Sequence, residues 1–157
     1  MIEVGEQIPA GTLRTLTDEG VQSIDPQTFF RGKKVVLFGV PAVFTPGCTQ
    51  VHLPDYVKQA EQIREKGFDL IACLSVSDAW VMHAWAEHVG AAGTVMMLAD
   101  DQAKYARALG IQLDLTQAGM GMRCKRFSMV VVDGIVESIN IDERKIDLTG
   151  AEHTCGL

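Results

Sequence analysis

The chain has 157 residues, of which 47% are hydrophobic and 22% are charged. This length and composition are typical of one globular domain with a sizeable core, so we expect a single domain over residues 1–157. The formal net charge of -6 argues against nucleic acid or an anionic membrane surface as the main partner, because both select basic patches. No apolar run is long enough to span a bilayer, and the first residues lack the pattern of a secretory signal.

The N-terminal third predicts a hairpin, a helical turn and a buried strand. Residues 12–17 and 21–24 alternate around a turn that contains Gly20, which indicates the hairpin. Residues 25–30 are expected to form a single helical turn. The continuous apolar run over 35–40 predicts a strand that is buried on both faces, and therefore a central parallel strand.

The middle of the chain alternates helices and strands. Residues 50–66 predict a helix that ends at Gly67, and Pro54 is expected to kink or restart it. A second buried strand follows over 68–75. Residues 79–89 predict a helix with Asp78 as N-cap and Gly90 as C-cap.

The last third predicts a strand over 95–99, then a helix over 102–109 that begins after Asp100 or Asp101 and ends at Gly110. We expect residues 111–122 to form a surface loop. Asp133-Gly134 between two apolar runs, 127–132 and 135–141, is a strong hairpin signal. Thr149 is expected to cap a short final helix. The whole pattern indicates an α/β architecture.

The four cysteines form no C-x-x-C pair; they are Cys48, Cys73, Cys124 and Cys155. Their spacing suits neither a zinc site nor the disulfide framework of a secreted domain. The histidines show no ligand spacing with cysteines or acidic residues either, so we expect no metal and no other cofactor. Free thiols in a chain without a signal favour a reducing compartment, with the cytoplasm as the default.

One stretch, residues 40–48, joins the central strand to the following helix. Its Pro and Gly residues predict a turn that delivers Cys48 to the first turn of the helix. There the unpaired N–H groups and the positive end of the helix dipole favour thiolate over thiol. Thr45, three residues earlier, lies close enough to aim its hydroxyl at whatever approaches the sulfur. An inert cysteine buried in a turn is the structural alternative.

The spacing of Pro41, Thr45 and Cys48 resembles the peroxidatic P-x-x-x-T-x-x-C motif of the peroxiredoxins. Four longer strings are similar to the peroxiredoxin-5 type: V-V-L-F-G-V-P-A-V-F-T-P-G-C, H-L-P-D-Y, L-S-V-S-D-A-W-V-M-H-A-W and K-R-F-S-M-V-V-V-D-G-I-V. The resemblance covers nearly the whole chain. It implies a thioredoxin-like fold with a central mixed β-sheet flanked by helices and peroxiredoxin-type additions. It also implies a thiol-dependent peroxidase that reduces hydrogen peroxide and organic hydroperoxides through a Cys48 sulfenic acid.

The resemblance assigns a role to each motif residue. Cys48 is the nucleophile, Thr45 orients the peroxide and Pro41 shields the sulfur. Among the basic residues of R-C-K-R, the spacing alone does not choose between Arg123, Lys125 and Arg126, and a solvated surface run is the structural alternative. The K-R-F-S-M match selects Arg126 as the catalytic arginine, whose fork of donors would hold a developing oxyanion.

Several neighbours are candidates for the pocket. His52 lies four residues after Cys48, on the same helical face, where it would tune the thiolate or line the pocket; a structural histidine is the equal alternative. Phe44 and Gly47 are further pocket candidates. Family members often dimerise through the active-site end, so we expect a homodimer in which Phe44, Pro46 and one of the two tryptophans, Trp80 or Trp85, lie at the contact.

Cys155 is the candidate resolving cysteine, although it falls several residues beyond the position that some relatives use. A one-cysteine cycle is therefore favoured, in which glutathione, glutaredoxin or thioredoxin reduces the sulfenic acid. Cys73 is expected to be an inert core thiol. A thioredoxin-type disulfide exchanger is excluded, because no second cysteine lies beside Cys48. A non-enzymatic peroxide sensor or holdase chaperone on the same fold is the alternative function.

Overall fold

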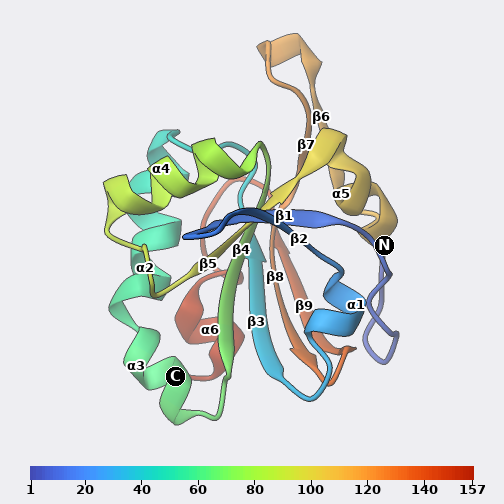
Figure 1. Ribbon diagram of the computed structural model, residues 1–157, viewed down its shortest axis with the longest axis vertical. Helices are drawn as coiled ribbons and strands as arrows, with labels where there is room; N and C mark the ends of the chain where they lie inside the picture. The colour runs from blue at the N-terminus through green and yellow to red at the C-terminus, as the bar shows by residue number, and fades with distance from the viewer.

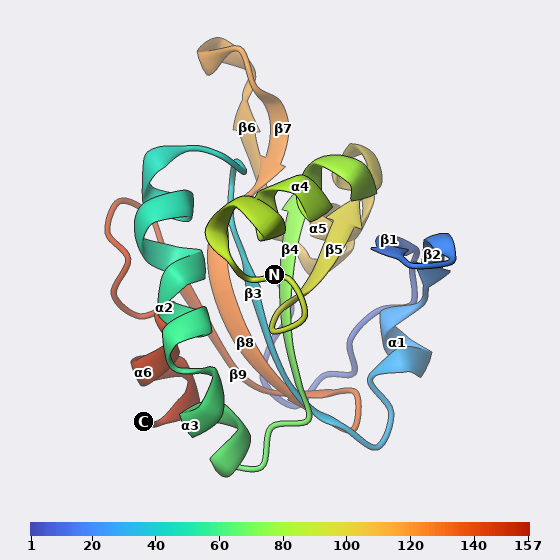
Figure 2. The same cartoon turned by 60° about the vertical axis from the view of Figure 1, so that its left-hand side comes forward.

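A computed structural model describes all residues from Met1 to Leu157 and contains one mixed seven-stranded sheet with helices on both faces (Figures 1 and 2). The strand order in this sheet is β2-β1-β5-β4-β3-β8-β9. Its strands are β1 (Leu13–Thr17), β2 (Gly20–Ile24), β3 (Lys34–Gly39), β4 (Leu70–Val76), β5 (Met96–Asp100), β8 (Arg126–Val132) and β9 (Ile135–Asp142).

The directions of the strands confirm the mixed sheet. β3 pairs in parallel with β4, and β4 in parallel with β5. On its other side β3 pairs antiparallel with β8, which continues into β9 through a hairpin. The central strand is therefore parallel to only one of its two neighbours. The hairpin turn follows the sequence signal, since Asp133 and Gly134 both have positive φ, at 49° and 80°.

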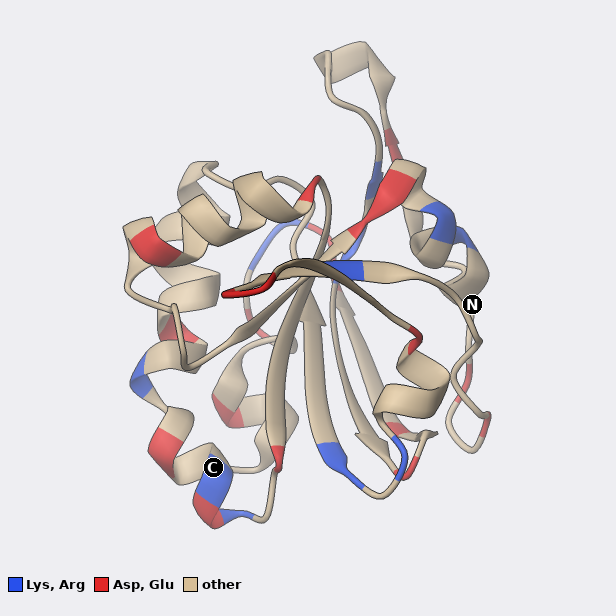
Figure 3. Ribbon diagram, in the orientation of Figure 1, with Lys and Arg blue, Asp and Glu red and all other residues tan.

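Two hydrophobic cores lie on opposite faces of the sheet. One face is covered by α2 (Leu53–Lys58), α3 (Ala60–Glu65), α4 (Ala79–Val89) and α6 (Ala151–Cys155), and the other by α1 (Pro26–Phe29) and α5 (Lys104–Leu109). The side chains of β3 alternate between the two cores, with Phe38 in the first and Leu37 in the second. The central strands β5, β4, β3 and β8 carry charged residues only at their ends (Figure 3).

The segment after β3 confirms the expected helix with a restart at proline. A π-helical turn over Cys48–His52 leads into α2, where Pro54 occupies the first turn and so needs no N–H partner. A second break at Gln59 separates α2 from α3. α4 has the predicted bounds and caps, since Asp78 accepts from the Val81 N–H at 2.8 Å and Gly90 adopts a left-handed φ of 80°.

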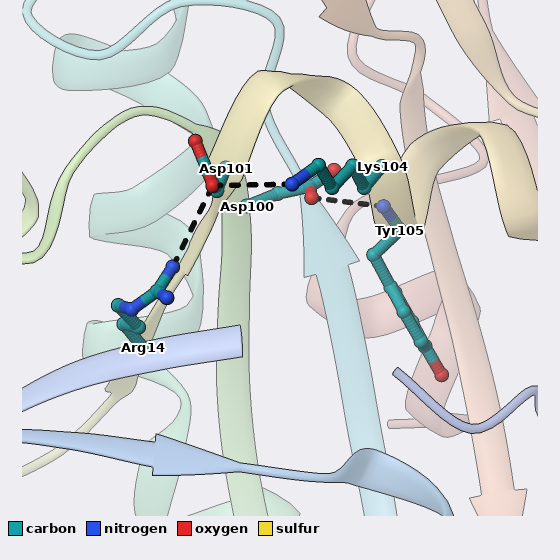
Figure 4. A network of polar contacts seen from close by, with 5 residues as sticks. All are labelled: Arg14, Asp100, Asp101, Lys104 and Tyr105. Carbon is teal, nitrogen blue, oxygen red and sulfur yellow. Dashed lines mark hydrogen bonds and ion pairs between the residues drawn. The ribbon is translucent and has the colours of Figure 1, made fainter. Parts of the chain in front are cut away.

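The start of α5 differs from the prediction. Asp100, a buried carboxylate, accepts from the Tyr105 N–H at 2.9 Å (Figure 4). It also accepts from the Ala106 N–H at 2.8 Å. It thereby caps the helix, as expected, although it lies four residues before Lys104, the first residue of α5. The intervening Gln102 and Ala103 have positive φ of 54° and 58°, and the helix begins only after them.

Two other expectations are wrong. Residues 111–122 are not a loop: β6 (Gln112–Leu115) and β7 (Gly121–Cys124) pair into a hairpin that projects from the body of the molecule (Figures 1 and 2). Nor does Thr149 cap the final helix. Gly150 is the N-cap of α6, and the first N–H, that of Ala151, donates to the Asp55 carboxylate of α2 at 2.7 Å. No helix has both the length and the apolar character that a bilayer crossing requires.

Candidate active site

Cys48 lies where the loop after β3 turns into the helical segment. It is the first residue of the π-helical turn, and its side chain is buried. The loop closes onto this turn through the Thr49 N–H, which donates to the Thr45 carbonyl at 3.0 Å. The sulfur is therefore held at the start of a helical turn, as the sequence predicts.

Arg126 contacts this sulfur from the neighbouring strand. Arg126 Nη2 donates to Cys48 Sγ at 3.2 Å. The two residues are distant in sequence, but β8 pairs antiparallel with β3, and the last pair, Gly39 with Phe127, places Arg126 beside the end of β3. The guanidinium is permanently charged, so a fixed positive charge lies against the sulfur.

His52 holds the other arm of the guanidinium. Arg126 Nη1 and His52 Nδ1 are 2.8 Å apart, and His52 Nε2 lies 3.1 Å from the Thr149 carbonyl. A carbonyl only accepts and a guanidinium only donates, so the ring must carry its proton on Nε2 and accept on Nδ1. This tautomer is the neutral one. Burial, aided by the charge of Arg126, lowers the pKa of His52 to about 4 and keeps the ring neutral.

A backbone carbonyl anchors this arrangement. The Thr149 oxygen accepts from His52 Nε2 and also from the Tyr56 hydroxyl, at 2.7 Å. Tyr56 stacks on Phe38 with ring centroids 3.9 Å apart, which fixes it against the sheet. The sulfur is thus connected to the core through Arg126, His52 and one carbonyl.

Asp142, at the end of β9, fixes the loop that presents the Thr149 carbonyl. Its carboxylate accepts from the Thr149 N–H at 2.8 Å and the Thr149 hydroxyl at 2.7 Å, and also from the N–H groups of Asp147 and Leu148. Burial alone would raise the pKa of this carboxyl, but the hydrogen bonds outweigh it and hold the pKa of Asp142 below its ordinary value.

The other candidate residues make their contacts with groups other than the sulfur. The Thr45 hydroxyl donates to the Ala42 carbonyl at 2.6 Å, so it braces the turn and leaves its oxygen lone pairs able to accept. Pro41 lines a cavity together with Arg126. A methyl group on Gly47 would lie 3.7 Å from Arg126 Nη2, which places this glycine against the guanidinium. Phe44 lies outside the buried site: it is half exposed, has a φ of 65°, and its ring faces His88 of α4.

Arg123, which the spacing alone did not separate from Arg126, has a different environment. Its Nε donates to the Met120 carbonyl at 2.7 Å and its Nη1 to the Val76 carbonyl at 3.4 Å. It therefore fastens the β6–β7 hairpin to the end of β4. Lys125 lines the cavity beside Arg126 and makes no contact with the sulfur.

The remaining thiols lie in the core. Burial raises the pKa of Cys73 well above its ordinary value and the pKa values of Cys124 and Cys155 to about 12. Cys124 Sγ donates to the Val40 carbonyl at 3.3 Å. Cys155 lies on α6 rather than on a mobile chain end, and all four cysteines are free.

Sequence reasoning missed three supports of the site. Tyr56 was part of the H-L-P-D-Y string, four residues after His52, and this helical spacing was the available signal. The Thr149 carbonyl had none, because a backbone acceptor has no side-chain identity, and Asp142 had none because no motif or spacing links it to Cys48. Both reach the site only through the pairing of β8 with β9.

Comparisons with known proteins give a family match and similar relatives. Residues 3–153 match the family described as Redoxin. Peroxiredoxin-2E, chloroplastic, of Arabidopsis thaliana is 40% identical over 146 residues, which make up 90% of this chain and 62% of that protein. The chain therefore spans less than two thirds of that relative.

Solved structures are similar over nearly the whole fold. Reduced Prx3 from Vibrio vulnificus in complex with H2O2 has a TM-score of 0.94 and 41% identity, covering 98% of this chain and 96% of that one. Peroxiredoxin 5 from Alvinella pompejana has a TM-score of 0.82 and 32% identity, covering 90% of each chain. These matches confirm the thioredoxin-like α/β fold expected from the sequence.

Proposed function

The chain belongs to the redoxin family and is a peroxiredoxin, and from this premise we propose that it is a thiol peroxidase with Cys48 as its nucleophile. The observation that carries the proposal is the 3.2 Å contact between Arg126 Nη2 and Cys48 Sγ at the start of a helical turn. The substrates are hydrogen peroxide and organic hydroperoxides. One similar structure is described as a complex with H2O2, which supports the first of these.

The reaction begins when the Cys48 thiolate attacks one peroxide oxygen. An S–O bond forms, the O–O bond breaks, and the leaving oxygen departs with the electron pair. That oxygen takes up a proton to become water or an alcohol, and Cys48 becomes a sulfenic acid. Two equivalents of an external thiol then reduce the sulfenic acid: the first displaces water to form a mixed disulfide, and the second releases Cys48.

Each neighbour has a role in this step. Arg126 stabilises the thiolate and the oxygen on which charge develops. The Thr45 hydroxyl oxygen, whose proton is committed to the Ala42 carbonyl, accepts the peroxide O–H and so orients the substrate. Pro41 lies in the adjoining wall and shields the sulfur from water.

The test uses peroxide consumption with dithiothreitol as reductant. Cys48→Ser is expected to abolish turnover, and Arg126→Ala to slow Cys48 oxidation by about 100-fold or more, as with loss of other anion-stabilising donors. Arg123→Ala is the matched control, since it removes the same charge three residues away and is expected to keep near wild-type activity. A Cys48→Ser variant that still turns over peroxide would overturn the proposal.

Turnover also separates the enzyme from the alternative, a peroxide sensor or holdase. A sensor reacts once with peroxide but need not be recycled quickly. Sustained consumption of many equivalents per chain supports the enzyme, whereas a single equivalent with slow recovery favours the sensor.

An external thiol is the proposed reductant, with glutathione, glutaredoxin or thioredoxin as candidates. Cys155 is the alternative, but α6 holds it in place: the Ala151 N–H is bonded to Asp55, and Ser128 and Thr154 share a hydrogen bond of 2.7 Å. Its raised pKa keeps it a thiol rather than a nucleophilic thiolate. For Cys155 to reach the sulfenic acid, α6 would have to leave the core.

A homodimer through the active-site end is part of the proposal. Trp85 is buried and donates to the Thr49 hydroxyl, so it has no part in a contact. Trp80 is 64% exposed on α4, the helix that also carries the partner of Phe44. Exposed aromatic side chains are enriched at interfaces. Trp80→Glu is expected to shift the mass measured by light scattering from dimer to monomer, and an unchanged mass would exclude this contact.

A further inference from the structure

A cavity of about 270 Å³ adjoins the Cys48 site. Arg126 and Pro41 lie in its wall, and Arg126 is the residue that contacts Cys48 Sγ. Small-molecule sites usually have volumes of about 300–1,000 Å³, so this one suits a short ligand or part of a longer one. A molecule in the cavity would therefore touch Arg126, the residue that also contacts the sulfur.

Strand pairing gives the cavity its lining. β8 and β9 are paired so that Arg126 lies opposite Asp142, with Ile141 one position further along. Leu113 comes from the base of the β6–β7 hairpin, which is tied to the chain just before β8 by the Lys125 N–H donating to the Ile111 carbonyl at 2.8 Å. Two apolar side chains, Leu113 and Ile141, therefore lie beside the charged ones.

The basic and acidic side chains of the cavity wall differ in whether they already have bonding partners. Lys125 and Arg144 both line the cavity, and neither takes part in any of the three ion pairs of the chain. Of the two acidic residues in the wall, Asp142 already accepts four hydrogen bonds from residues 147–149. Glu143 is therefore the one acidic side chain of the wall without such hydrogen bonds, and it faces two cations without ion-pair partners, Lys125 and Arg144.

We propose that this cavity binds the anionic tail of an organic hydroperoxide, with its carboxylate held by Lys125 and Arg144 and its carbon chain against Leu113 and Ile141. The peroxide end then lies at Arg126, facing Cys48. The proposal rests on the peroxidase function and adds a substrate class to it, namely hydroperoxides that carry a carboxylate away from the O–O bond. Because the tail is remote from the reacting atoms, its recognition acts on substrate binding rather than on the chemical step.

The test compares three oxidants: hydrogen peroxide, cumene hydroperoxide and the ring-carboxylated analogue of cumene hydroperoxide. Stopped-flow Trp fluorescence gives the second-order rate constant of Cys48 oxidation for each, with no reductant present. The expected result is a preference for the carboxylated over the neutral cumene hydroperoxide. In the Lys125→Gln/Arg144→Gln double variant this preference falls by about five- to tenfold, as loss of one to two partly exposed charge contacts predicts, while the rate with hydrogen peroxide is unchanged.

Two single variants make the test two-sided. Glu143→Gln removes the opposing charge, so it is expected to raise the preference for the carboxylated oxidant. Lys145→Gln removes a cation from the same loop that does not line the cavity, and it is expected to leave the preference unchanged. An equal loss in Lys145→Gln and in the double variant would show only a general effect of net charge and would overturn the assignment.

A carboxylate could also belong to the reducing thiol. The sulfenic acid form is therefore mixed with glutathione, which is anionic, or with 2-mercaptoethanol, which is neutral. If the double variant slows only reduction by glutathione and leaves the oxidant preference intact, the cavity serves the reductant and the substrate assignment is wrong. If hydrogen peroxide does not oxidise Cys48 at all, it is the peroxidase function that fails.

Discussion

At the scale of single residues, His52 decides how the guanidinium faces the sulfur. The neutral ring connects Arg126 Nη1 to the Thr149 carbonyl, so it is a positioning residue that acts through Arg126. The sequence left two alternatives for this histidine, tuning of the thiolate or a structural role. Its contacts combine both, because a structural hydrogen bond to a loop sets the orientation of the charged group.

Two amide variants of His52 separate its two hydrogen bonds. His52→Asn keeps an acceptor near the Nδ1 position for Arg126, whereas His52→Gln keeps a donor near the Nε2 position for Thr149. Loss of a hydrogen bond to a charged group costs about 1.5–3 kcal/mol, so His52→Gln is expected to slow Cys48 oxidation by about tenfold or more. His52→Asn is expected to retain more of the rate.

The contrast between the two variants is the control, because both replace the ring by an amide of similar polarity. Equal rates of Cys48 oxidation in the two variants would mean that the ring acts only by filling space.

His52 also predicts how stability depends on pH. Its pKa is about 4 in the folded chain and 6.5 when unfolded, so between these values the unfolded state binds more protons. The contribution of neutral His52 to the free energy of unfolding is therefore fully present above pH 6.5 and is lost as the pH falls to about 4. At about 1.4 kcal/mol per pH unit the loss is of the order of 3 kcal/mol. Urea unfolding of wild type and His52→Gln across this range measures it, and a slope that persists in the variant would assign the effect elsewhere.

At the scale of elements, the junction of β3 and β8 brings the site together. Gly39 lies opposite Phe127, the residue that follows Arg126, and a Cβ at Gly39 would overlap the Phe127 ring. Both residues are buried, so the ring has no room to move away. The missing side chain at Gly39 therefore allows the close packing that positions Arg126.

Gly39→Ala is accordingly expected to destabilise the chain by about 1–3 kcal/mol, the usual cost of overpacking a core. Denaturant unfolding measures this change. In the Gly39→Ala/Phe127→Leu double variant the smaller side chain makes room for the methyl group, so the loss should be less than the sum of the two single losses. Strict additivity would show that the two positions do not collide.

The β6–β7 hairpin shows why some elements cannot be predicted from the sequence pattern. Its strands are four residues each and include Gly121, so they lack the long alternating run that indicates a strand. The hairpin is also held by a contact outside itself, the hydrogen bond from Arg123 Nη1 to the Val76 carbonyl at the end of β4. Such contacts have no local signal.

At the scale of the whole molecule, the position of Cys155 predicts the product of oxidation. Intact mass after one equivalent of hydrogen peroxide, without added thiol, is expected to show one added oxygen that maps to Cys48. Loss of two hydrogens with a Cys48–Cys155 bridge would show instead that α6 leaves the core during the cycle. Cys155→Ser is expected to leave turnover with an external thiol unchanged, because the thiol it removes is buried away from the reaction.

The sequence by itself determined the elements whose signals are local. Caps such as Asp78, the Asp133-Gly134 turn and the apolar run of β3 act within a few residues, and so the α/β order and the delivery of Cys48 to a helix start were predictable. The motif match likewise singled out Arg126 over its basic neighbours.

Only the tertiary structure decided what surrounds the sulfur. The contact of Arg126 with Cys48 depends on the antiparallel pairing of β3 with β8, and its orientation on a carbonyl presented by a loop that Asp142 fixes. These residues lie far apart in the sequence, and they come together through the register of paired strands and through hydrogen bonds to backbone carbonyls. Side-chain identity and spacing encode neither of these, whereas folding brings them together because the two faces of the sheet must both be buried.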